Sequence, residues 1–263
     1  MTQQQIHQQP HVTLVGAGPG DPELLTLKAV KAIAAATVLL VDDLVSDAIV
    51  AYASPSARII YVGKRGGCKS TPQAFIEKLM LQEALADENV VRLKGGDPFI
   101  FGRGGEEVEH LRAQGVTVTV INGITAGLAG VTSLGVPLTH RAHAHGVLFI
   151  TGHAKQDATD AVDWGALSHT AAQAKLTLVI YMGMSGAAQL QTALLHGLDP
   201  HTPVAVIQHV TLATQRHVLC TLSELHNTVV RNHMASPSVI VVGDVLQGLL
   251  HITQDHQRFV AAA

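Results

Sequence analysis

The segment VVRLKGGDPFIFGRGGEE, residues 90–107, decides the fold that we expect for this chain. It begins with a short apolar run, continues through five glycines in eleven residues, and ends on two acids that suit the first turn of a helix. Ligands of parallel sheets bind beyond the carboxyl ends of the strands. Glycines let the backbone approach a ligand closely, at an entropic cost that an ordinary loop has no reason to bear. The segment therefore predicts an α/β protein with a ligand site at this loop.

Short β-branched runs recur on both sides of the segment and alternate with longer amphipathic or Ala/Leu-rich stretches. This rhythm is typical of strands joined by helical crossovers, and nearly continuous apolar strands indicate a sheet covered on both faces. In Gly135-Val136-Pro137 the proline restricts Val136 to extended conformations and ends the preceding helix, so we expect an N-terminal α/β domain, mostly a parallel sheet, over residues 11–136. Its strands are expected at 12–15, 38–41, 59–62, 90–93 and 116–121, and its helices near 23–35, 72–86, 105–114 and 125–134.

The second half predicts a mixed sheet. The strands expected at 203–208 and 216–221 follow each other without room for a helical crossover, which indicates an antiparallel pair. We assign residues 137–252 to this C-terminal α/β domain, residues 1–10 to a disordered tail and 253–263 to a flexible tail. The other strands of the C-terminal domain are expected at 146–151, 176–181 and 238–242. Its helices are expected near 185–196, 222–233 and 244–250, with a further helix inside 155–175.

Composition argues against several functional classes. Of 263 residues, 47% are hydrophobic and 14% charged, with a formal net charge of -3, so the chain is expected to be globular and a poor nucleic-acid binder. Its apolar runs fall well short of the about 20 residues of a membrane helix. Residues 1–10 lack the basic and apolar regions of a signal peptide, which predicts a cytoplasmic protein. Cys68 and Cys220 are then most simply free thiols.

A glycine turn, Gly16-Ala17-Gly18-Pro19-Gly20-Asp21, follows the first expected strand. It differs from a dinucleotide-binding fingerprint because Asp21 replaces the third glycine and Pro19 removes a backbone donor. Asp42, at the end of the second strand, imitates the acid that such folds use to bind a ribose. An NAD site is not favoured, and a plain tight turn remains an alternative reading of these glycines.

Charged side chains follow several of the expected strands. Asp97 can accept hydrogen bonds from a ligand, and Arg103 offers a planar fork for a carboxylate. Glu106 and Glu107 also suit the first turn of a helix, and this explanation is preferred for Glu107. Five cations are expected around one cleft and favour a polyanionic ligand: Lys64, Arg65, Lys94, Arg103 and Arg141.

A histidine group invites a metal reading, which the sequence does not support. No carboxylate or thiol stands at ligand spacing from these side chains, as zinc sites usually require. We therefore expect no metal. The histidines are His140, His143, His145 and His153.

Seven motifs together resemble the S-adenosyl-L-methionine-dependent tetrapyrrole methylase family over residues 12–245. The resemblance implies two α/β domains with the methyl donor in the cleft between them, in a homodimer. It also implies methylation of uroporphyrinogen III at C2 and C7, giving precorrin-2 and S-adenosyl-L-homocysteine, towards sirohaem, cobalamin or haem d1. The motifs are VGAGPGDPELLTLKA, VGKRGG, VVRLKGGDPFIFGRGGEE, GVPLTHR, TGH, YMG and SPSVIVVG.

The resemblance also implies roles for particular residues. Asp42 and Lys64 match positions proposed for proton transfer, and Arg103, Glu106 and Arg141 match positions implicated in substrate binding or catalysis. Asn122 stands where proline is usual. Val210 stands where many relatives have glycine, so it can offer only backbone contact without a positive φ. The positions that match the donor site are Pro19, Gly95, Gly96, Asp97, Ile100, Thr125, Ala126, Met182, Val210 and Ser238.

The chemistry fits this assignment, because a substrate with eight carboxylates needs cations, and an adenosyl ligand suits an apolar pocket with a few fixed polar groups. Arginine is too basic to remove a proton, so Arg103 suits carboxylate anchoring, and Asp42 or Glu106 suits proton removal. Two alternatives remain open. One is another methyltransferase of this fold, a later precorrin methylase or a diphthine-type enzyme; the other is a non-catalytic tetrapyrrole- or nucleotide-binding module, which turnover of the donor would exclude.

Overall fold

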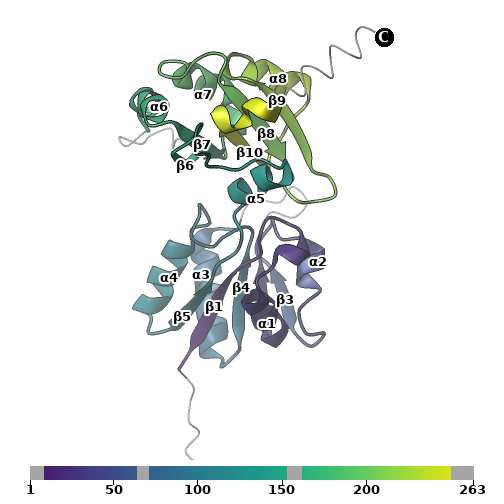
Figure 1. Ribbon diagram of the computed structural model, residues 1–263. Helices are drawn as coiled ribbons and strands as arrows, with labels where there is room; N and C mark the ends of the chain where they lie inside the picture. The colour runs from purple at the N-terminus through teal and green to yellow at the C-terminus, as the bar shows by residue number, and fades with distance from the viewer. Residues whose placement is uncertain (1–8, 64–70, 153–161, 250–263) are drawn as a thin grey trace, which may run out of the picture. The chain divides into compact units, whose positions relative to one another are not determined.

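The computed structural model describes residues 9–63, 71–152 and 162–249, and Figure 1 shows their helices and strands. The chain divides into two compact units, Met1–Thr125 and Ala126–Ala263. Each unit is built on its own five-stranded sheet. No helix in the described ranges is long and apolar enough to cross a membrane.

The sheet of the first unit has the strand order β3-β2-β4-β1-β5, and every described pairing in it is parallel. Apolar β-branched runs form these strands, as the sequence predicts, although β3 starts and ends one residue earlier than expected. The strands are β1 (His11–Gly16), β2 (Val38–Val41), β3 (Arg58–Tyr61), β4 (Val90–Lys94) and β5 (Thr117–Ile121).

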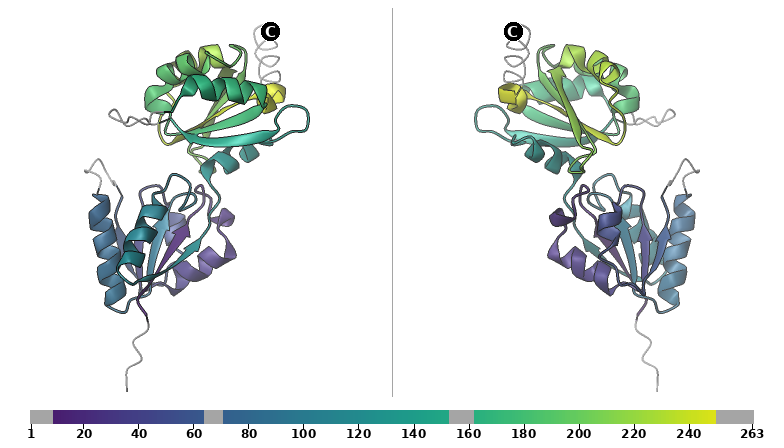
Figure 2. Two further views of the ribbon diagram at one scale, coloured as in Figure 1. Left: turned by 90° about the vertical axis from the view of Figure 1, so that its left-hand side faces the viewer. Right: turned by 90° about the vertical axis from the view of Figure 1, so that its right-hand side faces the viewer.

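Helices cover both faces of this sheet (Figure 2), which explains why its strands are apolar on both sides. Helices α1 (Leu27–Ala35) and α2 (Asp47–Val50) pack with Leu39 and Val41. On the other face, α3 (Gln73–Leu85) and α4 (Gly104–Ala113) pack with the alternate side chains of the same strands, including Val38, Leu40 and Val90.

The covering helices determine where the loops after β1 and β4 lead and which way the side chains of β4 point. The connection after β1 runs over one face of the sheet and the connection after β4 over the other, although these strands are neighbours. This is a topological switch point, where open α/β sheets bind ligands. The alternation also places Arg92 and Lys94 of β4 on the α3/α4 face, because they lie two and four residues after Val90.

The second unit has a mixed sheet of order β6-β7-β10-β8-β9, which confirms the predicted class. β6 pairs in parallel with β7, and the remaining pairs are antiparallel, including the predicted pair β8/β9. The strands are β6 (Gly146–Thr151), β7 (Leu176–Tyr181), β8 (Pro203–Gln208), β9 (Arg216–Thr221) and β10 (Ser238–Val242). The helices are α5 (Ala126–Ser133), α6 (Trp164–Gln173), α7 (Ala187–Leu194) and α8 (Leu225–Arg231).

Several helices begin later than expected. The predicted helix 23–35 is a 3-10 turn at Pro22–Leu24 followed by α1, because the Thr26 hydroxyl accepts from Ala29 N at 3.1 Å and caps a new helix start. Similar 3-10 turns at Met184–Gly186 and Leu222–Glu224 precede α7 and α8. Helix α2 was not predicted, since four residues carry too little periodicity.

The division between the units falls after Thr125, eleven residues before the boundary expected at 136. Helix α5 belongs to the second unit because it packs on β7 and β10, and Gly127 N donates to the Tyr181 hydroxyl at 2.7 Å. The proline at 137 marks the end of a helix, and a helix end need not be a domain boundary.

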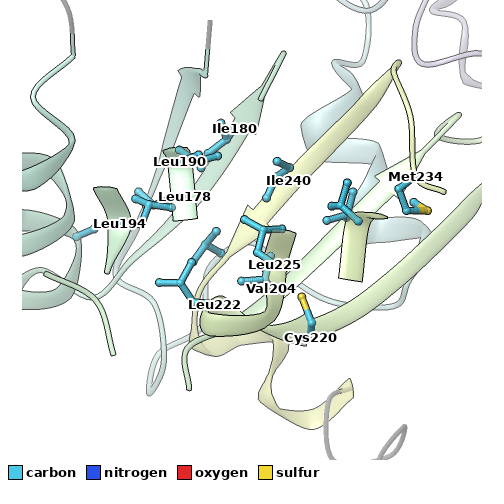
Figure 3. Close-up of a cluster of buried hydrophobic side chains, with 14 residues drawn as sticks. Leu178, Ile180, Leu190, Leu194, Val204, Cys220, Leu222, Leu225, Met234 and Ile240 are labelled. Atoms are coloured by element: carbon cyan, nitrogen blue, oxygen red, sulfur yellow. The ribbon is translucent and has the colours of Figure 1, made fainter. Parts of the chain in front are cut away.

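The second unit has its own hydrophobic core, drawn in Figure 3. Side chains of β7, β8 and β10 pack there against α7 and α8, with Trp164 of α6 at the periphery. Cys220 lies in this core as a free thiol, and burial raises its pKa to about 11, so it is a poor nucleophile. Cys68 lies outside the described residues.

We expect Leu194→Ala to lower the free energy of unfolding of the second unit by about 2–5 kcal/mol, because Leu194 is fully buried and its truncation leaves a cavity. Trp164 is the chain's one tryptophan and packs on this core, so urea unfolding followed by its fluorescence reports on this unit. Val230→Ala, at a position 58% exposed, is the control and should change the value by no more than about 0.5 kcal/mol. Equal effects of the two changes would contradict this core assignment.

Candidate functional site

The loops after β1 and β4 pair through their backbones at the switch point. Ala17 N donates to Lys94 O at 2.8 Å, and Gly18 and Gly96 exchange two hydrogen bonds, at 3.1 and 2.7 Å. The loop after β5 joins them so closely that a Cβ on Gly16 would lie 2.4 Å from Gly123 N. Only glycine permits this approach, so the three loops form one backbone platform.

Asp97 holds the platform together. Its buried carboxylate accepts from Phe99 N at 2.8 Å, from Asn122 Nδ2 at 3.1 Å and from Gly123 N at 3.2 Å. Asn122 thus ties the β5 loop to the β4 loop through its side chain. The Asp97 carboxylate therefore positions loops, and its contact with a ligand stays a prediction.

Gly96 leaves open space on one side of the platform. Its φ of 67° is left-handed, and among the described residues a Cβ there would meet only Thr125 Cα, at 3.8 Å. At the preceding Gly95, a Cβ would lie 2.8 Å from Leu44 Cβ. Pro19 is half-buried next to Gly18, and Ile100 is exposed in the β4 loop. The platform therefore offers backbone groups and apolar side chains to a ligand that lies against Gly96.

A cavity of about 270 Å³ opens at the carboxyl ends of β2, β3 and β4, within the described part of the first unit. Its charged lining residues are Asp42, Asp43, Arg92, Lys94 and Arg103. Arg92 and Lys94 are each only 2% exposed, so the cavity has buried cations in its wall. Burial and the neighbouring Arg92 lower the pKa of Lys94, while Glu107 and Asp42 oppose that shift.

Glu107 of α4 lies behind these cations and is fully buried. Its Oε1 accepts from Lys94 Nζ at 3.1 Å, from Gln73 Nε2 at 3.1 Å and from Arg92 Nε at 3.3 Å. The helix-terminus explanation preferred for Glu107 from sequence is therefore insufficient, because a fully buried carboxylate needs partners. Two charged residues in a strand buried on both faces were the signal that a buried acid was required.

Arg103 and Glu106 pair at the start of α4, as their i, i+3 spacing allows. Arg103 Nε donates to Glu106 Oε1 at 3.0 Å, and Arg103 Nη2 donates to Glu106 Oε2. Both side chains are 54% exposed. The Glu106 hydrogen bond raises the pKa of Arg103, which therefore stays charged. Being exposed, the pair can open to another carboxylate.

In the second unit, the predicted residues lie where β7 and β8 end and β10 begins. Met182 follows β7, Val210 lies two residues after β8, and Ser238 begins β10, which runs antiparallel to both strands. Ala126 starts α5, which the Tyr181 hydroxyl holds at the end of β7. Val210 is only 5% exposed and its side chain lies against Gly130 of α5, so its backbone contact with a ligand stays a prediction.

Left-handed backbone marks the loops at these edges. Eight described non-glycine residues have positive φ, and three of them, Asp87, Lys175 and His233, directly follow helix caps, where this conformation is common. None of the other five follows the C-terminal cap of a helix, and Arg103 is instead the N-cap residue of α4. These lie in the loops after β4, β7 and β8, at Phe101, Arg103, Met182, His209 and Thr211. Such strain collects at functional sites.

Other predicted residues lie elsewhere. Lys64, Arg65 and His153 fall outside the described residues. Arg141 is exposed in the second unit, in the turn where His140 N donates to Ala144 O at 2.9 Å. The rings of His140 and His143 lie 4.7 Å apart. Over the ranges that the structure describes, no three His, Cys, Asp or Glu are grouped to hold a metal ion.

A parallel sheet with a glycine platform at its switch point and a separate mixed sheet define a two-domain α/β protein built to bind a ligand at its loops. Residues 11–226 match the sequence profile of the Tetrapyrrole (Corrin/Porphyrin) Methylases. This match spans the described strands and helices of the first unit and continues into the second unit as far as the start of α8.

Known proteins extend the match. The chain is 50% identical over 240 residues to a uroporphyrinogen-III C-methyltransferase of Pseudomonas aeruginosa, over 91% of this chain and 95% of that one. It is 49% identical over 236 residues to a siroheme synthase of Edwardsiella ictaluri, over 89% of this chain but only 50% of that one. A structure of the Thermus thermophilus uroporphyrin-III C-methyl transferase with S-adenosyl homocysteine is 39% identical, with a TM-score of 0.76 over 90% of this chain and 99% of that one. This chain belongs to the tetrapyrrole methylase family.

Asp97→Asn replaces one acceptor oxygen by a donor that faces Gly123 N or Phe99 N. We expect the change to destabilise the first unit by about 1–3 kcal/mol, because a buried hydrogen-bond partner is left unsatisfied. Hydrogen–deuterium exchange should become faster in peptides covering residues 96–99 and 122–125. The control is Asp87→Asn, which changes a residue with left-handed backbone that asparagine tolerates. Unchanged exchange in both loops would show that Asp97 does not hold them.

Proposed function

We propose that this chain is an S-adenosyl-L-methionine-dependent methyltransferase that methylates uroporphyrinogen III at C2 and C7 and releases precorrin-2 and S-adenosyl-L-homocysteine. The observation that carries the proposal is the open side of Gly96 on the glycine platform. The name of the Pseudomonas aeruginosa relative supports the substrate, and the bound S-adenosyl homocysteine of the Thermus thermophilus relative supports the donor.

The donor fits the residues of the platform. A flat adenosyl group needs close backbone approach, which Gly96 permits, and apolar cover, which Ile100 and Pro19 can supply. Gly95 is assigned to the donor from the family resemblance, since its own Cβ direction faces Leu44. When bound, the donor supplies an electrophilic methyl group on a sulfonium, so no metal is needed. We assign to the same ligand the remaining positions that match the family: Asp97 and Thr125 in the first unit, and Ala126, Met182, Val210 and Ser238 in the second.

The substrate chemistry falls to the charged residues. In each methyl transfer one carbon–carbon bond forms at the ring as the sulfur–methyl bond of the donor breaks, S-adenosyl-L-homocysteine leaves, and one proton must leave the substrate carbon skeleton. Asp42, a partly exposed carboxylate at the cavity, suits proton acceptance. Arg103 suits anchoring of a substrate carboxylate, with Glu106 as the partner that it releases. Lys64 and Arg141 keep the roles that the family resemblance implies, in proton transfer and substrate binding.

The alternatives are less well supported. A later precorrin methylase or a diphthine-type enzyme would use the same fold, but the 50% identity lies with a relative named for uroporphyrinogen III. The chain spans about half of the siroheme synthase that it matches, so we do not extend that enzyme's whole activity to it. A homodimer remains a prediction from the family resemblance, which light scattering of the purified chain tests.

Gly96→Val should abolish S-adenosyl-L-homocysteine binding, measured by calorimetry, because its side chain would fill the open space beside Thr125. The matched control is Gly115→Val at the end of α4. Gly115 has a similar φ of 76°, and no described residue lies within 4 Å of a Cβ there, so this change carries the same backbone strain away from the platform. Equal loss of binding in both variants, or wild-type affinity in a folded Gly96→Val protein, would contradict this donor site.

Arg103→Lys should reduce methylation of uroporphyrinogen III about a hundredfold or more, since lysine keeps the charge but loses the planar fork that aligns the substrate, an effect on the order of 3 kcal/mol. The assay supplies porphyrinogen and donor and reads product mass, expecting two added methyl groups with the wild type. Affinity for S-adenosyl-L-homocysteine should stay near that of the wild type. Normal turnover would mean that Arg103 merely pairs with Glu106 on the surface, and a loss of donor binding would mean that the two ligands share this residue.

A further inference from the structure

Four side chains in the first unit form a chain of alternating charge: Asp42, Arg92, Glu107 and Lys94. Arg92 Nη2 lies 3.4 Å from Asp42 Oδ2, and Arg92 Nε lies 3.3 Å from Glu107 Oε1. Lys94 Nζ lies 3.1 Å from the same Glu107 oxygen. The two acids and two bases cancel in formal charge, and they come from three elements, the end of β2, strand β4 and helix α4.

Burial distinguishes Asp42 from the other three of these charged side chains. The side chains of Arg92, Lys94 and Glu107 are at most 3% exposed, whereas that of Asp42 is 35% exposed and lines the cavity. Burying three charges costs several kcal/mol for each ion, and apolar side chains of similar volume would often serve stability equally well. Stability therefore gives these charges no evident purpose, while the accessible carboxylate lies where a substrate could meet it.

Arg92 has the shape to connect the two acids. Its Nε faces Glu107, its Nη2 faces Asp42, and its Nη1 donates to Leu93 O at 3.3 Å. A planar guanidinium fixes these directions together, which a single ammonium group cannot do.

Glu107 fixes Arg92 from behind. Its Oε1 is shared by Arg92, Lys94 and Gln73, while no described residue donates to Oε2. Its place in the first turn of α4 favours a negative charge there. The acid thus sits at a helix end that stabilises it and holds the two strand cations on one side.

We propose that Glu107 is a positioning residue that acts through Arg92 to hold the Asp42 carboxylate in the orientation in which it accepts the substrate proton. The inference deepens the proposed methyltransferase function and rests on it. In this proposal Asp42 contacts the substrate, whereas Glu107 and Arg92 act on it only by orienting Asp42. Asp43 also reaches Asp42, since its N–H donates to Asp42 Oδ1 at 3.0 Å, but it lies on the next backbone position and needs no side chain for that contact.

The test is Glu107→Gln, which keeps the shape of the side chain and removes its charge. The variant has a means of folding, because burial already lowers the pKa of Lys94, which can give up its proton when its anionic partner is removed. With uroporphyrinogen III and donor, we expect kcat to fall at least tenfold. KM for the porphyrinogen and affinity for S-adenosyl-L-homocysteine should stay within about twofold of the wild type.

Arg92→Lys is the second variant, and it should lower kcat to a similar extent because lysine cannot contact both acids at once. Glu109→Gln is the matched control, the same chemical change on the exposed side of α4, and it should leave kcat unchanged. Melting temperatures of all variants identify any that are unfolded.

Several outcomes would overturn the inference. A normal kcat in Glu107→Gln or in Arg92→Lys would show that the charges do not act through Asp42. A fall in kcat together with a rise in KM and a fall in donor affinity would show the same. If neither variant folds, the charges are required for folding and the positioning role is rejected. If the wild type binds the donor but does not methylate uroporphyrinogen III, the proposed function itself fails and the inference falls with it.

Discussion

The backbone pairing of Gly18 with Gly96 is the constraint on which the rest of the first unit depends. The two loops come from neighbouring strands whose helices cover opposite faces of the sheet, so the loops would diverge without a direct link. Two backbone hydrogen bonds supply that link, and the close approach of Gly16 to Gly123 adds the third loop. The platform that results is made of main chain, which leaves its donors and acceptors at fixed positions before any ligand arrives.

A main-chain platform also needs side chains that hold it, and these are charged. Asp97 fixes the platform from the β5 side through three hydrogen bonds. Glu107 fixes the β4 strand from the α4 side through Arg92 and Lys94. Both carboxylates are buried, so losing any of their hydrogen-bond donors is costly. Movement of one loop would therefore break hydrogen bonds to its neighbours. The three loops are therefore coupled, so the residues of these loops that we assign to donor and substrate are positioned together.

The strands of both units were predictable because each is a short apolar run bounded by turn residues, and their bounds agree with the structure to within two residues. Helix starts were less predictable, since Thr26 begins α1 through a side-chain cap that competes with the pattern around it. The place of α5 depends on packing against β7 and β10, which no local pattern encodes. The partners of Glu107 depend on which face of β4 carries Arg92, and that follows only once the sheet and its covering helices are known. Assignment of the donor and substrate residues required the family resemblance, and those roles stay predictions.

The distribution of strained backbone separates positions shaped by folding from positions shaped by binding. Asp87, Lys175 and His233 terminate helices, where a left-handed residue satisfies the last carbonyl groups and costs little overall. Arg103 and Met182 have the same conformation without that benefit, and both project exposed side chains from loops at a strand end. Left-handed backbone costs an L-residue roughly 1–2 kcal/mol. A loop that needed only to connect β4 to α4, or β7 to α7, could place glycine at these positions and avoid the cost. Helix C-termini do not account for the strain at Arg103 and Met182, so the roles predicted for both residues from the family resemblance are compatible with their backbone conformation.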